Sequence, residues 1–232
     1  MTTTVDRGDW LDARRALLRK EKELTRLRDE VAALRRALPR VRIDKQYMFT
    51  GVNGRVSLDD LFAGRSQLIV YHFMLGPDWN EPCKHCSFWA EHHDATRVHL
   101  AHRDVELAVV SRAHIQKIAQ IKHRFGWQFP WVSSLGGDFN FDFGVSFPDG
   151  KPEQPNYNFA TQTFGGSEAP GLSVFQRDAD GAIFHTYSTY SRGLDALNGT
   201  YQLLDLVPKG RDEAALEYPM AWVRLKDRYE TA

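Results

Sequence analysis

The first forty residues carry an apolar residue at every seventh position. These residues are Trp10, Leu17, Leu24, Val31 and Leu38, while Ala13, Leu27 and Leu34 fill most of a second seam, with Lys20 as the exception. Two apolar seams in a seven-residue repeat are typical of a helix that packs along one narrow stripe. The pattern predicts a helix over residues 9–38, with Asp9 as its N-cap and Pro39 as its end. The stripe suits docking on the chain's own domain or on a partner subunit, so a homodimer through this helix is one expectation.

After residue 40, short apolar runs alternate with helical patterns. Two hairpins are predicted around Asn53-Gly54 and Asp180-Gly181, because such dipeptides adopt the turns that join antiparallel strands. The other predicted elements follow from run length and periodicity. They are a strand over 67–74, a helix over 84–102, a strand over 105–110, a helix over 113–125, an extended segment over 129–133 and a helix over 194–206.

The order of these elements predicts the fold class. A strand–helix–strand–helix unit, followed by a β-hairpin and a last helix, gives an α/β fold with a central mixed sheet and helices on both faces. We therefore expect an amphipathic helix over residues 1–40 and an α/β domain over residues 41–232. Residues 135–169 are rich in Gly, Asn, Asp, Pro and Phe and lack periodicity. A loop of this length is usually functional or wraps a surface.

The only two cysteines of the chain, Cys83 and Cys86, lie where the strand over 67–74 leads into the helix over 84–102. This spacing lets two sulfurs on a first helical turn come within bonding distance. The free N–H groups and the positive dipole end of the helix favour a thiolate at the first cysteine. The pattern predicts dithiol–disulfide chemistry without a cofactor, on a protein or small-molecule thiol or disulfide.

Two other functions are compatible with the sequence. A metal-binding protein would use the two cysteines together with nearby histidines, of which His92 and His93 are the first candidates and His99 and His102 the next. The two-turn separation between Cys86 and His93 makes one compact tetrahedral site awkward, and a solvated helix surface is the simpler explanation of these histidines. A non-catalytic interaction module would use the loop over 135–169.

Charge and hydropathy exclude several classes of partner. The chain has 232 residues with 30 basic and 30 acidic side chains, so the formal net charge is zero and nucleic acid is not an expected partner. No long uncharged apolar segment is present, so no membrane span is expected. The N-terminal residues lack the apolar core of a secretory signal, which leads us to expect a cytoplasmic protein. In such a protein a lone cysteine pair is more often catalytic or metal-binding than structural.

The order of elements, with a Cys-x-x-Cys after the first core strand and Pro170 just before the last hairpin, resembles the thioredoxin superfamily. The segment from Phe49 to Phe62 is similar to the peroxiredoxin-like and thiol-reductase branch. Over about residues 40–230, the chain resembles a bacterial family of unknown function that is described as thioredoxin-like dithiol–disulfide oxidoreductases. The stretches that carry this resemblance are Leu68–Met74, Cys86–Trp89, Phe129–Ser134, Phe139–Val145 and His185–Tyr190.

The resemblance implies roles for three residues. Cys83 matches the exposed nucleophilic cysteine of the superfamily, and Cys86 matches the buried resolving cysteine. Pro170 matches a proline whose peptide bond is cis and which faces the disulfide, leaving a backbone carbonyl and an N–H for a substrate chain. Asn80 stands where the peroxiredoxin motif has Thr or Ser, which argues against a peroxidase.

The residues between the cysteines are expected to tune the first sulfur. Lys84 and His85 stand where thioredoxin has Gly-Pro. A positive charge or a hydrogen-bond donor here stabilises the thiolate of Cys83, and we expect the larger effect from His85 because Lys84 can turn to solvent. Thioredoxin's buried acid has no clear counterpart; Tyr71 or His72 falls nearby, and either is equally compatible with plain core packing.

Overall fold

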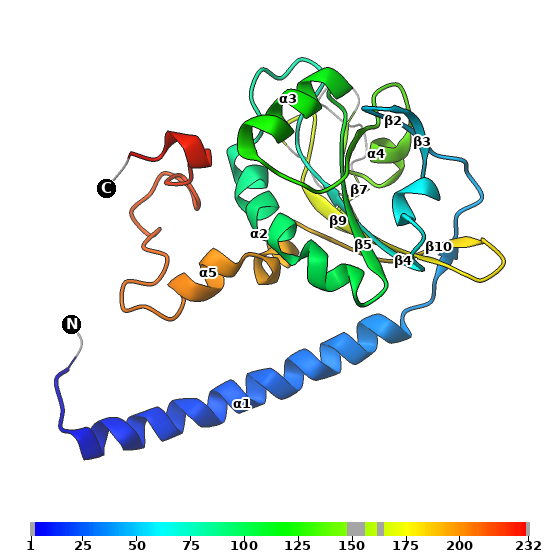
Figure 1. The fold of residues 1–232 in the computed structure, drawn as a ribbon. Coiled ribbons are helices and arrows are strands. Elements are labelled where there is room, and N and C mark those ends of the chain that lie inside the picture. The colour runs from blue at the N-terminus through cyan, green and yellow to red at the C-terminus, as the bar shows by residue number, and fades with distance from the viewer. Residues whose placement is uncertain (1–2, 148–155, 162–164, 231–232) are drawn as a thin grey trace. The chain divides into compact units, whose positions relative to one another are not determined.

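The computed structural model describes residues 3–147, 156–161 and 165–230 (Figure 1). The chain divides into two compact units, Met1–Pro39 and Arg40–Ala232. In these described ranges, no helix is both long enough and apolar enough to cross a membrane.

The first unit is a single helix, α1 (Arg7–Ala37). Its N-cap is Asp6, whose side chain accepts a hydrogen bond from the N–H of Asp9 at 2.9 Å, so the prediction of Asp9 as the cap is wrong. Asp9 instead lies in the first turn, where its negative charge is favoured by the helix dipole. None of the described α1 residues is buried, and Leu27 and Leu34 of the heptad seam are 55% and 61% exposed.

The second unit is built on an eight-stranded mixed sheet with the order β1-β10-β9-β4-β5-β6-β2-β3. Strands β4, β5 and β6 are parallel, and the other neighbouring strands pair antiparallel. Their bounds are β1 Val41–Arg42, β2 Met48–Gly51, β3 Gly54–Ser57, β4 Gln67–His72, β5 Val105–Ser111, β6 Trp131–Ser133, β9 Gly171–Arg177 and β10 Ile183–Tyr190. A separate two-stranded sheet joins β7 (Asn156–Tyr157) to β8 (Ala160–Thr161).

Side chains of successive residues in β4 and β5 point to opposite faces of the sheet, which gives two apolar layers. On one face, Tyr71 and Val109 pack with helices α2 (Lys84–Ala101) and α3 (Ile115–Phe125). On the other face, Val70 packs with the 3-10 helix η1 (Asp60–Phe62) and with α4 (Phe139–Asp142). The sheet therefore lies between two helical layers, as Figure 1 shows, and the predicted α/β class is confirmed.

The core connectivity also agrees with the predicted thioredoxin-like topology. The unit β4–α2–β5 is a parallel crossover, and the antiparallel hairpin β9–β10 joins the other side of β4. The hairpin β2–β3 extends the sheet beyond β6, where Thr50 pairs with Ser133. The carboxyl ends of β4 and β5 therefore meet at the edge of the sheet from which α2 starts.

The C-terminal region differs from the single helix predicted over 194–206. A 3-10 helix, η3 (Ser191–Leu197), and a short α-helix, α5 (Gly199–Leu204), are separated by Asn198. Asn198 has an extended backbone, and its side chain accepts a hydrogen bond from the N–H of Tyr201 at 3.1 Å. An asparagine in this role starts a new helix instead of continuing the old one. After α5, the described chain has one regular element, the 3-10 helix η4 (Lys226–Arg228).

A buried polar chain connects β4, β9 and β10. The Nε2 atom of His72 lies 2.9 Å from Ser173 Oγ, which lies 2.8 Å from Ser188 Oγ. Ser188 Oγ in turn lies 2.7 Å from the Nε2 atom of His185. Burial lowers the pKa of His72 to about 3, with a smaller contribution from His185, so His72 is neutral in the folded protein at neutral pH.

We predict that acidification destabilises the fold through His72. In the unfolded chain this histidine takes up a proton near pH 6.5, whereas the folded protein keeps it neutral down to about pH 3. Stability is therefore lost as the pH falls below about 6.5, and the loss attributable to one such histidine is about 2 kcal/mol at pH 5. Urea unfolding of the wild type and of His72→Gln at pH 7 and pH 5 measures it.

The variant should be less stable at pH 7 but should lose less stability on acidification. His99→Gln, at an exposed position of α2, is the matched control and should keep the wild-type pH dependence. An unchanged pH dependence in His72→Gln would contradict the prediction.

Candidate active site

The two cysteines lie at the start of α2, just beyond the carboxyl end of β4. The loop that joins β4 to α2 closes where the N–H of Cys83 donates to the carbonyl of Met74 at 3.3 Å. Cys83 occupies the N-cap position of α2, and its Sγ accepts a hydrogen bond from the N–H of Cys86 at 3.5 Å. Both residues are free thiols; Cys83 is half-buried, whereas Cys86 is 2% exposed. Cys83 is therefore the more accessible of the two sulfurs.

The environments of the two thiols shift their pKa values in opposite directions. Hydrogen bonding with the Cys86 thiol, and then with the His85 side chain and the Cys86 N–H, holds the pKa of Cys83 well below its ordinary value. Burial, together with the adjacent Cys83 sulfur, raises the pKa of Cys86 well above its ordinary value. The pair is thus poised as one thiolate and one thiol, which is the state from which thiol–disulfide exchange starts.

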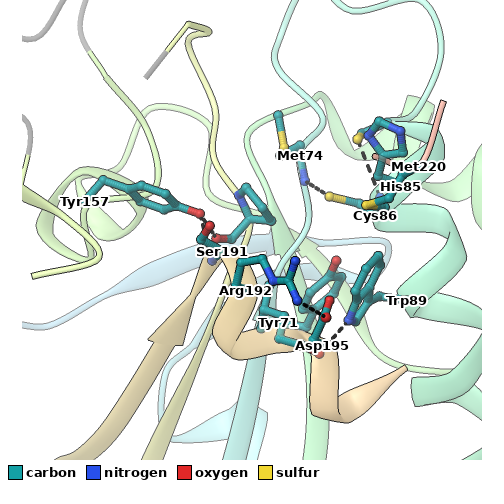
Figure 2. Close-up of a pocket in the computed structure, with 13 residues that line it drawn as sticks. Tyr71, Met74, His85, Cys86, Trp89, Tyr157, Ser191, Arg192, Asp195 and Met220 are labelled. Atoms are coloured by element: carbon teal, nitrogen blue, oxygen red, sulfur yellow. Dashed lines mark hydrogen bonds and ion pairs between the residues drawn. The ribbon is translucent and has the colours of Figure 1, made fainter. Parts of the chain in front are cut away.

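Two further groups hold the inner sulfur. The N–H of Met74 donates to Cys86 Sγ at 3.4 Å (Figure 2). The Tyr71 side chain acts on the same thiol, where it offsets part of the rise in the pKa of Cys86. Tyr71 is 1% exposed, and burial raises its pKa well above the ordinary value, so it acts as a neutral donor. Of the two residues considered for the position of a buried acid, Tyr71 lies at the sulfur. His72 lies on the opposite face of the sheet, bonded to Ser173.

The residues between the cysteines point to different partners. His85 is hydrogen-bonded to Cys83, and its Nε2 atom is buried without a partner. The ring of Tyr218 stands edge-on to the His85 ring, with centroids 6.2 Å apart. Lys84 does not turn to solvent, because its Nζ donates to the carbonyl of Ala221 at 3.3 Å and lies 5.7 Å from the Tyr218 ring. His85, rather than Lys84, is therefore the side chain directed at the reactive sulfur.

The peptide bond before Pro170 is trans, because none of the described residues has a cis peptide bond. The predicted cis bond is therefore wrong. The segment is already extended before the proline: Ser146 and Glu168 form an antiparallel bridge, and the N–H of Ala169 donates to Val145 at 2.8 Å. An extended segment that runs directly into β9 needs no reversal at Pro170, and the trans form is the intrinsically favoured one.

A cavity of about 310 Å³ opens beside the cysteines (Figure 2). Both cysteines, His85 and Pro170 lie in its wall, so the structure brings all four predicted site residues to one place. Most of the remaining wall is aromatic or apolar, and is formed by Tyr71, Met74, Trp89, Tyr157, Leu194 and Met220. Apolar walls with a few placed polar groups are typical of sites for small molecules.

Sequence reasoning missed the far wall of this cavity. Tyr157 comes from the segment 135–169, where a functional loop was expected but no residue could be singled out. Ser191, Arg192 and Asp195 come from η3, and the prediction of a helix beginning at residue 194 gave no reason to direct them at the cysteines. Arg192 and Asp195 form an ion pair at 3.1 Å. These residues reach the cavity because η3 packs against α2, and this contact joins segments that are far apart in the sequence.

The histidines considered as metal ligands do not join the cysteines. His93 packs against the ring of Tyr71, and burial lowers its pKa to about 4. The Nε2 atom of His92 lies 3.1 Å from Thr200 Oγ1. Across the described ranges, no group of three or more His, Cys, Asp or Glu side chains comes close enough together to hold a metal ion. The site therefore offers a dithiol rather than a ligand set.

Several solved structures are similar to this chain at low sequence identity. Peroxidoxin BcpB from Mycobacterium tuberculosis aligns with a TM-score of 0.47 and 14% identity, over 72% of this chain and 97% of that chain. The mitochondrial 2-cys peroxiredoxin from Plasmodium falciparum gives a TM-score of 0.43 and 14% identity, over 72% and 92%. A thiol:disulfide interchange protein from Bacteroides sp. gives 0.43 and 14%, over 76% and 97%.

The search of curated proteins found no match to this sequence. A family model does match, over residues 1–229, and it describes a bacterial protein of unknown function, DUF899. The match includes α1 as well as the unit that carries the cysteines. It confirms the resemblance to a bacterial family of unknown function: the chain belongs to the DUF899 family.

Proposed function

We propose that this protein is a dithiol–disulfide oxidoreductase, with Cys83 as the nucleophile and Cys86 as the resolving cysteine. The observation that carries the proposal is the position of Cys83 Sγ, which caps α2, borders the cavity and accepts a hydrogen bond from the Cys86 N–H at 3.5 Å. The side chains of Cys86 and His85 also lower the pKa of this thiol. These interactions favour a thiolate at Cys83, while burial raises the pKa of Cys86.

The reaction uses only these two sulfurs and a substrate disulfide. The Cys83 thiolate attacks one substrate sulfur, the substrate S–S bond breaks, and the departing thiolate takes up a proton. Cys86 loses its proton and attacks Cys83 Sγ, which releases the second substrate thiol and leaves a Cys83–Cys86 disulfide. The Tyr71 hydroxyl and the Met74 N–H assist this step, because both donate to Cys86 as its charge develops. A substrate dithiol drives the same steps in reverse.

The first prediction of this mechanism concerns which sulfur reacts. Alkylation of the reduced protein at mildly acidic pH should modify Cys83 before Cys86, because only Cys83 is both accessible and stabilised as a thiolate. Peptide mass mapping identifies the labelled residue. Cys86→Ser should accumulate a mixed disulfide with a substrate, and Cys83→Ser should form none.

Preferential labelling of Cys86 would reverse the assignment. If both cysteines are unreactive toward every disulfide and the insulin reduction assay is blank, the protein is a non-catalytic interaction module instead.

The second prediction concerns His85. Removing its hydrogen bond in His85→Ala destabilises the Cys83 thiolate, and therefore the reduced form relative to the disulfide. We expect the Cys83 pKa to rise and the reduction potential to fall, by about 30 mV for each tenfold loss of thiolate stability. Thiolate ultraviolet absorbance and equilibration with a glutathione buffer measure the two quantities.

Lys84→Met is the matched control, because Lys84 donates to the carbonyl of Ala221 and not to the sulfur. Lys84→Met should change the Cys83 pKa and the reduction potential less than His85→Ala does. An unchanged pKa and potential in His85→Ala would leave the start of α2 as the sole source of thiolate stabilisation.

We also propose that α1 associates with α1 of a second copy as a parallel coiled coil. The apolar seam of α1 is flanked by two rows of seven-residue spacing. One row is Asp9, Ala16, Glu23 and Glu30, with a net negative charge, and the other is Arg14, Glu21, Arg28 and Arg35, with a net positive charge. In a parallel, in-register pair, each row faces the opposite row of the other helix. The facing pairs are Asp9 with Arg14 of the partner subunit, Glu23 with Arg28 of the partner subunit, and Glu30 with Arg35 of the partner subunit.

An antiparallel pair would instead place acidic rows opposite each other and basic rows opposite each other. The charge pattern therefore favours the parallel arrangement, although each exposed pair contributes only about 0.3–0.5 kcal/mol. Lys20 interrupts the apolar seam, and a charged residue at such a position restricts the register at some cost in stability.

The third prediction follows from these rows. Glu23→Arg with Glu30→Arg should make the protein monomeric, because four of the facing pairs in the dimer then join two basic side chains. Arg28→Glu with Arg35→Glu should also make it monomeric, because the same four pairs then join two acidic side chains. An equimolar mixture of the two variants should recover the dimer, because each of these four pairs then joins one acidic and one basic side chain.

Analytical ultracentrifugation of each variant and of the mixture provides the test. The mixture also controls for loss of folding, since a misfolded helix would not associate. Equal masses for the wild type, both variants and the mixture would contradict the proposal.

A further inference from the structure

The hydroxyl of Tyr157 occupies a central position in the cavity wall. It donates to the carbonyl of Pro170 at 2.9 Å and accepts from the N–H of Ser191 at 3.1 Å. Figure 2 shows the ring of Tyr157 reaching from its own loop toward Ser191. Burial raises the pKa of this tyrosine, so the hydroxyl keeps its proton and both bonds. The Tyr157 side chain therefore bonds one backbone group in the segment that leads into β9 and another at the start of η3.

The segment that leads into β9 is also paired along its length. The N–H of Ala169 donates to the carbonyl of Val145 at 2.8 Å, and the N–H of Phe147 donates to Ser167 at 2.9 Å. Glu168, in the middle of the segment, accepts from Ser146 Oγ and from Arg112 at 3.1 Å. Residues 145–147 thus lie along residues 167–169 as a short antiparallel partner. That position would otherwise be open to an extended substrate.

Binding of an extended polypeptide at a sheet edge requires free backbone N–H and carbonyl groups. The expectation from sequence was that the backbone at Pro170 supplies such groups to a substrate chain. In the structure, the N–H of Ala169 and the carbonyl of Pro170 already have internal partners. A substrate strand could pair here only by breaking these bonds, and a buried polar group left without a partner costs about 1–3 kcal/mol.

The cavity itself has little net charge to offer a substrate. Arg192 and Asp195, which lie in its wall, form an ion pair, and Arg211 bonds both Asp195 and Asp205 at 2.8 Å. This cluster of two arginines and two aspartates sums to zero. The rest of the wall is aromatic, aliphatic or thioether, apart from the cysteines, His85 and Ser191. Such a wall favours an apolar body over a multiply charged one.

We infer that the site takes a small, largely uncharged disulfide or dithiol, and not an extended polypeptide. The inference rests on the proposed dithiol–disulfide function. The Cys83 thiolate attacks one sulfur of the small disulfide inside the cavity. Cys86 then releases the second thiol, so that two electrons pass from the protein dithiol to the substrate. The only protons required are those that convert the two departing thiolates to thiols, and the Cys86 thiol supplies one of them.

The test compares two disulfides with the same sulfur chemistry. One is cystine blocked at both ends by acetyl and methylamide groups, and the other holds the same cystine in the middle of longer, uncharged extended peptides. Single-turnover reaction with the reduced protein gives a rate constant for each. Reaction of each disulfide with dithiothreitol corrects for intrinsic reactivity. We expect the corrected rate constant of the small disulfide to exceed that of the peptide about tenfold, because the peptide must displace internal hydrogen bonds.

The possible failures are distinct. Equal corrected rate constants, or a preference for the peptide, would overturn the inference and leave the dithiol function intact. Failure of both disulfides to oxidise the protein, when both react with dithiothreitol, would overturn the dithiol function and the inference together.

A pair of tryptophan variants tests whether reaction takes place in the cavity. Met74→Trp adds volume to the wall, whereas Leu203→Trp adds the same ring at an exposed position of α5 outside the cavity. Met74→Trp should lower the rate constant of the small disulfide about tenfold, and Leu203→Trp should leave it nearly unchanged. The Cys83 pKa, from thiolate absorbance, should stay at its wild-type value in both variants and shows that the start of α2 is intact. Equal rate constants in the two variants would contradict a reaction inside the cavity.

Discussion

The rest of the site depends on the hydrogen bond by which Cys83 Sγ caps α2, from the N–H of Cys86. Helices are usually capped by an oxygen of Ser, Thr, Asp or Asn, and α2 uses a sulfur instead. A neutral thiol is a weak acceptor, but a thiolate satisfies the free N–H groups and the positive end of the helix dipole. The first turn of α2 contains no acidic residue that would compete for that field. The hydrogen bond from the Cys86 N–H therefore both caps α2 and lowers the pKa of Cys83.

The sheet supplies the second constraint, because it decides which side chains reach the inner sulfur. Tyr71 and His72 are neighbours in β4, yet one bonds Cys86 and the other bonds Ser173 on the opposite face. The parallel register of β4 with β5 fixes this alternation, and a shift of one residue would exchange the two side chains. A buried neutral tyrosine at the sulfur and a buried neutral histidine away from it are consequences of strand geometry.

Local sequence patterns were sufficient for the elements that hold the cysteines. The strand over 67–74, the helix after Cys83 and both hairpins depend on neighbours in the chain, and the structure has them with small shifts at their ends. Asn198 was missed because a helix period continues across it, and only its bond to Tyr201 shows that a new helix begins there. Tyr157 and Arg192 were missed for a different reason: their partners are distant in the sequence, and no local periodicity marks them.

The backbone around Pro170 differs from what the resemblance to the thioredoxin superfamily implies. That resemblance implies a cis proline whose neighbouring backbone is open to a substrate chain, whereas the bond before Pro170 is trans. Here the chain's own residues 145–147 pair with that backbone, and Tyr157 bonds the carbonyl of Pro170. The loop that provides both features lies between β6 and β9, outside the strands that define the fold. Topology thus positions the two sulfurs, while described residues of the loop bond the backbone groups beside Pro170.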